Sequence, residues 1–118
     1  MSIAANIVVA LVAVLHVYFL VLEMFLWDKP AGLRAFGQSL EQARSSKVLA
    51  ANQGLYNGFL AAGLVWGLIE GPPGLPIKLF FLCCVLAAGI YGAATASRKI
   101  LYVQALPAAV GLALLWLS

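Results

Sequence analysis

Two ionisable side chains, His16 and Glu23, interrupt the first long apolar run of the 118-residue chain. If this run is helical, they lie about 20° apart around its axis and about 10.5 Å apart along it. Ionisable groups inside an apolar span are rare and usually face protein or water. The pair predicts a proton-exchanging or cation-binding carboxylate, or an acid and a base acting on a substrate between them. The alternative is structural, with Glu23 near an interface and paired with Lys47 or Arg98.

Other polar residues interrupt the later apolar runs at helical spacing. Asn52 and Tyr56 are four residues apart, as are Gln53 and Asn57, so one helix would carry two adjacent polar stripes. Each amide by itself is explained by a hydrogen bond between helices. Taken together, the polar groups favour a ligand-binding or proton-exchanging pocket. The predicted site has nine members: His16, Glu23, Asn52, Gln53, Tyr56, Asn57, Tyr91, Thr95 and Gln104.

The elements that position these residues follow from composition, since 64% of the residues are hydrophobic and 9% are charged. Such a chain is neither a disordered tail, nor a nucleic-acid-binding module, nor an ordinary water-soluble enzyme. Four apolar runs are long enough to cross a bilayer as helices. They predict an all-α, antiparallel bundle of four transmembrane helices forming one domain, residues 1–118. The predicted spans are 3–27, 48–69, 77–96 and 101–117.

The distribution of basic residues predicts the orientation of the bundle. Six of the seven Lys and Arg residues lie in the connections 28–47 and 97–100, and Lys78 lies on the opposite side. The positive-inside rule therefore places both connections in the cytoplasm and both termini outside, in a bacterial inner (plasma) membrane. In this orientation all the predicted site residues except His16, near mid-depth, fall in the cytoplasmic half. We expect a polar pocket that opens toward the cytoplasm.

The first connection predicts a short amphipathic helix at the cytoplasmic interface. Leu33, Phe36, Leu40 and Ala43 recur at helical spacing, and a proline, Pro30, lies near the start. The helix would anchor the connection to the membrane surface or act as a lid. Ser45 or Ser46 would then cap the second span.

Small residues predict close helix packing in the second span. Gly54 and Gly58 form one G-x-x-x-G motif, and Gly63 and Gly67 form another on roughly the opposite face. This pattern favours a central helix with neighbours on both sides, or a homodimer. Neither a metal nor another cofactor is expected, because the chain has one histidine and its two cysteines are adjacent.

Three functions remain open at this point. The first is binding or transport of a small molecule or ion, with Glu23 and His16 as the protonatable centre. The second is a non-catalytic membrane partner, in which the polar residues only lock the helices together. The third is an enzyme acting on a lipid-like substrate. The sequence shows no nucleophile triad, phosphate loop or metal cluster that would support it.

The chain resembles a bacterial family known as domain of unknown function 1304. The matching stretches are residues 16–27, 47–59 and 88–93, followed by Gln104 and Pro107. The block Ala-Asn-Gln-Gly-Leu-Tyr-Asn-Gly within residues 51–58 is long and specific. The resemblance covers nearly the whole chain and implies a small four-helix inner-membrane protein. It brings no activity with it, but it implies that the polar residues are recurring motifs of the family.

Overall fold

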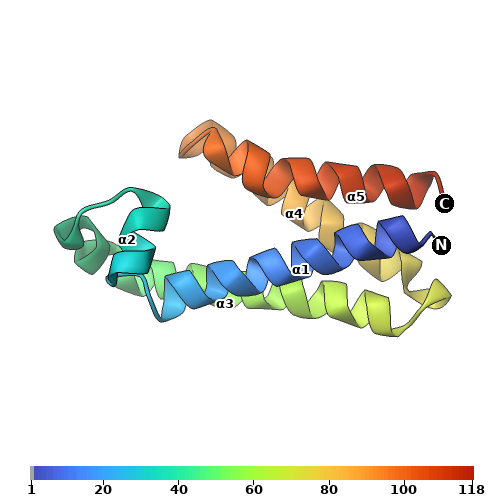
Figure 1. Ribbon diagram of the computed structural model, residues 1–118, viewed down its shortest axis with the longest axis horizontal. Coiled ribbons are helices and arrows are strands. Elements are labelled where there is room, and N and C mark those ends of the chain that lie inside the picture. The colour runs from blue at the N-terminus through green and yellow to red at the C-terminus, as the bar shows by residue number, and fades with distance from the viewer. Residues whose placement is uncertain (1) are drawn as a thin grey trace. The chain divides into compact units, whose positions relative to one another are not determined.

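A computed structural model describes residues 2–118. This part of the chain forms five α-helices, one 3-10 turn and one π-helical turn, without a strand, which confirms the all-α class (Figure 1). In chain order the elements are α1 (Ile3–Met24), α2 (Pro30–Phe36), α3 (Leu40–Ile69), the 3-10 turn η1 (Pro72–Gly74), α4 (Leu75–Thr95), the π turn η2 (Leu101–Ala105) and α5 (Leu106–Trp116).

The fold comprises two compact units, and each is described by itself. The terminal unit holds residues 2–14 and 60–118, and the hairpin unit holds residues 15–59. The helices α1 and α3 each contribute one part to both units. The single domain expected from the sequence stays a prediction.

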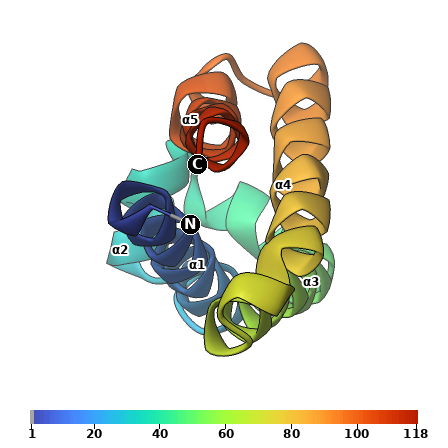
Figure 2. The same cartoon turned by 90° about the vertical axis from the view of Figure 1, so that its right-hand side faces the viewer.

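The core of the terminal unit is apolar. Buried residues from α1, α3, α4 and α5 form one cluster: Ala5, Val9, Val12, Ala13, Leu64, Leu82, Val85, Ala108 and Leu115. In this unit α4 packs along η2 and α5, which follow it after a short turn (Figure 2). Gly89 permits the close approach, because a Cβ atom there would lie 2.7 Å from the backbone nitrogen of Ala105.

The hairpin unit consists of the end of α1, all of α2 and the first two thirds of α3. Gly54 of α3 packs against α1, where a Cβ atom would lie 2.7 Å from Cγ of Met24 and 3.1 Å from Cβ of Glu23. One turn further, a Cβ atom at Gly58 would lie 2.7 Å from Cδ1 of Leu20. These small residues let the two helices pack closely, and we call the contact between them the α1–α3 seam.

The prediction of one amphipathic helix in the first connection is wrong. The segment is divided at Gly37, whose φ of 59° ends α2, and the residues after it belong to α3. The cap of α3 is Ser39, not Ser45 or Ser46. Its Oγ accepts a hydrogen bond from the Gln42 backbone amide at 3.1 Å, and Oε1 of Gln42 accepts one from the Ser39 backbone amide at 3.0 Å. This reciprocal capping box starts α3 eight residues before the predicted span.

Other predicted boundaries also move. The first helix ends at Met24 rather than residue 27, because the chain turns there toward α2. The third predicted span corresponds to α4, which begins at Leu75 after η1. The last predicted span begins with the π turn η2, just before Pro107, which has no amide hydrogen to donate.

Two segments, Ile3–Met24 and Pro72–Thr95, are long and apolar enough to cross a membrane. The last helical segment, Leu101–Trp116, is apolar but shorter. The helix α3 carries charged and amide side chains in its first half, which reduces its apolar character. The two apolar segments suggest association with a membrane, and the bundle of four spans stays a prediction.

Candidate functional site

The α1–α3 seam contains a buried carboxyl hydrogen-bonded to a buried amide. Glu23 is 4% exposed and Asn57 is 8% exposed. The Asn57 amide nitrogen donates a hydrogen bond to Oε1 of Glu23, with 2.5 Å between the two atoms. Gly54 lies one turn before Asn57 and allows α1 to come close enough for this contact. The structure therefore brings together two of the predicted site residues, one from each helix.

The pair leaves Glu23 with unused bonding capacity. Among residues 2–118, the Asn57 amide is the one hydrogen-bond partner of the Glu23 carboxyl. A carboxyl group has two oxygens, and the second is available to a proton, a cation or an amine. An ionised carboxylate in apolar surroundings is costly unless such a partner compensates for its charge. The arrangement suits a group that gains or loses a proton or cation.

His16 is fully buried on the same helix, two turns before Glu23. Its ring meets the ring of Phe19 edge-on, with 5.4 Å between the centroids. Among the described residues, no direct hydrogen bond joins His16 and Glu23. A water or substrate bridging His16 and Glu23 stays a prediction.

Three other predicted residues of α3 point away from the α1–α3 seam. Asn52, Gln53 and Tyr56 are exposed, and Tyr56 contacts Phe59 edge-on at a centroid distance of 5.8 Å. Within residues 2–118, neither Asn52 nor Gln53 has a hydrogen-bond partner for its side chain. The two polar stripes expected on this helix thus differ, because only Asn57 of the four residues is buried.

The remaining predicted residues belong to the terminal unit. Tyr91 and Thr95 are exposed on α4, and the Thr95 hydroxyl donates a hydrogen bond to the Tyr91 carbonyl oxygen at 2.7 Å. Gln104 is half-buried in the π turn η2. A pocket that unites all nine residues therefore stays a prediction.

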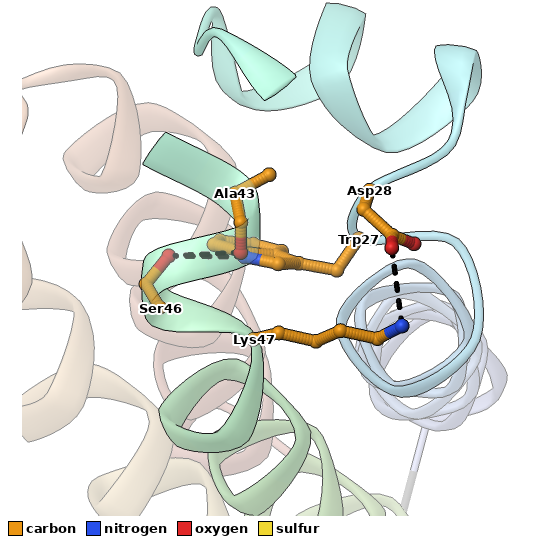
Figure 3. Close-up of polar contacts among 5 residues, drawn as sticks. All are labelled: Trp27, Asp28, Ala43, Ser46 and Lys47. Carbon is orange, nitrogen blue, oxygen red and sulfur yellow. Dashed lines mark hydrogen bonds and ion pairs between the residues drawn. The ribbon is translucent and has the colours of Figure 1, made fainter. Parts of the chain in front are cut away.

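Two contacts that the sequence did not predict join residues 27 and 28, just after α1, to the N-terminal part of α3 (Figure 3). The Trp27 indole nitrogen donates a hydrogen bond to Oγ of Ser46 at 3.1 Å. Nζ of Lys47 lies 3.1 Å from Oδ2 of Asp28, and this hydrogen bond lowers the pKa of the Asp28 carboxyl below its usual 3.8. The proposed pairing of Glu23 with Lys47 is wrong, because Lys47 pairs with Asp28.

A second buried polar contact lies in the terminal unit. Lys78 is fully buried, and its Nζ donates a hydrogen bond to Oδ1 of Asn6 at 2.9 Å. From the sequence, Lys78 was predicted only to be the single basic residue on the outer side of the membrane. The signal that could have found the contact was Asn6, a single amide in the otherwise apolar start of α1.

Comparisons with known proteins give a family but no activity. A relative from Lactococcus lactis subsp. lactis (strain IL1403), named uncharacterized protein YpaA, is 32% identical over 106 residues, covering 88% of this chain and 89% of the relative. No solved structure matches the chain. Residues 10–116 match the family described as protein of unknown function (DUF1304). This range includes the α1–α3 seam. On both comparisons, the chain belongs to the DUF1304 family.

Proposed function

We propose that this chain is a four-span integral membrane protein that binds or transports a small molecule or ion through the Glu23 carboxyl. Support for the bilayer comes from the exposed surface of α1. Large apolar side chains form one stripe along its length and just beyond its end, at intervals of three and four residues. They are Ile3, Ile7, Leu11, Val14, Tyr18, Val21 and Phe25. Soluble monomers rarely expose a continuous apolar surface of this extent, whereas lipid chains would cover it favourably.

The exposed charges support the proposed orientation. Every exposed Lys or Arg among the described residues lies in the connections 28–47 and 97–100. Lys78 is buried and neutral Asn6 is its hydrogen-bond partner, so it contributes little to a charged outer surface. The positive-inside rule then places both connections in the cytoplasm of a bacterial cell. Glu23 lies at the end of α1 nearer to the first connection, and Asn57 lies in the first half of the predicted span 48–69.

The observation that carries the binding function is the Glu23–Asn57 pair itself. A single amide donor holds one carboxyl oxygen at a fixed place between two helices, and the other oxygen is left for a ligand. Carboxyl groups inside membrane spans commonly serve proton relays and ion pathways. The ligand class that fits is a proton together with a monovalent or organic cation competing for the same oxygen.

Reconstituted liposomes test this function. A sodium gradient and a tetraphenylphosphonium gradient are imposed separately, and a trapped pH-sensitive dye reports proton movement. We expect movement in the opposite direction to at least one of the two cations. Glu23→Gln should abolish it, because glutamine still accepts the Asn57 hydrogen bond but cannot exchange a proton.

The matched control is Glu41→Gln, which removes an exposed acid in the first turn of α3. It should leave the proton movement unchanged. Equal proton movement in wild type and Glu23→Gln would contradict the proposal, as would the absence of movement with both cations.

A non-catalytic partner role is the second candidate, because the same hydrogen bond joins α1 to α3. In that case Glu23→Gln would leave growth and physiology unchanged while the protein stays folded. The liposome measurement separates the two roles, since only the first requires proton exchange.

A further inference from the structure

We propose that two copies of this chain associate in the membrane through the outward face of α3, with Asn52 at the centre of the contact. The inference rests on the bilayer location proposed above, but not on any ligand of Glu23. It starts from an amide that the hairpin unit leaves without a partner in a position where lipid cannot provide one.

The outward face of α3 is defined by four exposed residues. Val48, Asn52, Tyr56 and Phe59 fall within an arc of about 80° on a helix with 3.6 residues per turn. Asn52 lies near the middle of this arc. The opposite side of the helix holds the buried Gly54 and packs on α1. The amide is therefore surrounded by large apolar side chains on the surface of the hairpin unit.

The depth of Asn52 places it inside the predicted span. Lys47 pairs with Asp28 of the first connection, which marks the cytoplasmic end of the hairpin unit. Asn52 follows Lys47 by five residues, or about 7.5 Å along the helix. Lipid chains offer no hydrogen bonds at this depth, and an unsatisfied amide is costly there. Thr95 on α4 avoids that cost by bonding to its own helix, but the Asn52 side chain has no such bond among residues 2–118.

A second copy supplies the missing partner. A carboxamide both donates and accepts hydrogen bonds, so two Asn52 side chains can pair with each other across a two-fold axis. The charge bias inserts both copies in the same orientation, which fits such an axis along the membrane normal. Asparagine at this kind of interface is known to drive the association of membrane helices. Tyr56 and Phe59 would add aromatic contacts around the amide pair.

The glycine motifs are occupied within the chain and do not provide this surface. Gly54 and Gly58 face α1 in the hairpin unit. In the terminal unit, Gly63 faces the ring of Phe81 and Gly67 faces Lys78. The homodimer suggested by the sequence would therefore use the polar and aromatic face of α3 instead of its small residues.

Cysteine crosslinking in native membranes tests the interface. Cys83 and Cys84 are first replaced by alanine in the full chain, and Phe59→Cys is compared with Tyr18→Cys. The two positions are matched, because each is 54% exposed, on α3 and α1 respectively. Under mild oxidation we expect Phe59→Cys to form a disulfide-linked dimer and Tyr18→Cys to stay monomeric.

Substitution of Asn52 then tests the amide pair. In the Phe59→Cys background, Asn52→Leu should weaken association about tenfold in a dilution series, and Asn52→Gln should retain most of it. Equal crosslinking of Phe59→Cys and Tyr18→Cys would overturn the proposal. So would protection of Phe59→Cys from a maleimide reagent in the monomer, because α4 or α5 of the same chain would then cover this face. Carbonate extraction of the membranes checks the bilayer location separately.

Discussion

At the scale of single residues, the buried polar groups differ in what holds them. Glu23 and Asn57 bond to each other across the α1–α3 seam, and Lys78 bonds to Asn6 in the terminal unit. Asp28 and Lys47 form an ion pair whose side chains are 15% and 53% exposed, so solvent screens it. Loss of a buried bond should therefore lower the free energy of unfolding more, because removing one partner leaves the other without that bond.

A double-mutant cycle measures the bond between Glu23 and Asn57. Asn57→Leu should lower the free energy of unfolding by about 1–3 kcal/mol, because it leaves a buried carboxyl without its donor. The double variant Glu23→Leu with Asn57→Leu should recover much of that loss, since two apolar side chains can pack in the seam. Thermal unfolding of the purified protein in detergent micelles provides the measurement.

Gln53→Leu serves as the control for this cycle, because Gln53 is exposed on the same helix and has no hydrogen bond within residues 2–118. Because it breaks no hydrogen bond, Gln53→Leu should cause no loss in the free energy of unfolding. Strictly additive losses in the double variant would show that the two side chains do not interact.

The sequence singled out Glu23 and Asn57 because a polar side chain in an apolar run has few explanations other than a partner or a site. It could not show that they bond to each other, since this depends on the rotation of α1 against α3. The contact of Trp27 with Ser46 was missed for a related reason. Both residues lie near a turn whose path depends on the break at Gly37, and a glycine in a polar connection has several allowed conformations.

At the scale of elements, glycines determine how closely neighbouring helices approach, and they differ in what they face. The seam at Gly54 is lined by Met24, whose flexible side chain can move aside. The contact at Gly89 is different, because it faces the backbone of η2, and the three atoms nearest to an added Cβ all belong to Ala105.

Gly89→Ala should therefore destabilise the terminal unit. The added methyl would lie 2.7 Å from the Ala105 nitrogen and 2.9 Å from its Cα, and backbone cannot relax as a side chain does. We expect a loss of about 1–3 kcal/mol, measured by thermal unfolding in micelles. Gly92→Ala is the control on the same helix, since its methyl meets only side-chain atoms of Ile100, at 3.0 Å or more. Equal effects of the two substitutions would contradict this account of the α4–η2 contact.

The sequence was enough to predict that the helices exist, but it predicted their ends less well. Apolar runs predicted α1 and α4 closely, because an apolar run of about 20 residues favours a helix, which satisfies its own backbone hydrogen bonds. The start of α3 was misplaced because Ser39 and Gln42, three residues apart in a capping box, were less conspicuous than the serines at 45 and 46. The π turn η2 could not be predicted, since it depends on how α4 packs against residues 101–105.

At the scale of the whole molecule, the surface combines apolar helix sides with basic connections. This distribution makes the orientation in the membrane testable without any knowledge of the ligand. Arg34 and Arg98 are exposed, one in each basic connection.

Single cysteines at Arg34 and Arg98 should react with an impermeant maleimide only in inside-out vesicles. A cysteine introduced at Ser118 should react only in intact spheroplasts, because both termini are expected outside. Labelling of Arg34→Cys and Ser118→Cys from the same side would contradict the four-span arrangement. The measurement requires Cys83 and Cys84 to be replaced first.

The bond between Lys78 and Asn6 has a consequence for the order of biogenesis. The two residues are 72 positions apart, so Asn6 leaves the ribosome long before Lys78. When α4 is synthesised, Lys78 reaches the Asn6 oxygen by meeting a helix that has already been made. Packing of α4 against α1 therefore completes this contact, and a chain that lacks the start of α1 would bring Lys78 into the core without its Asn6 acceptor.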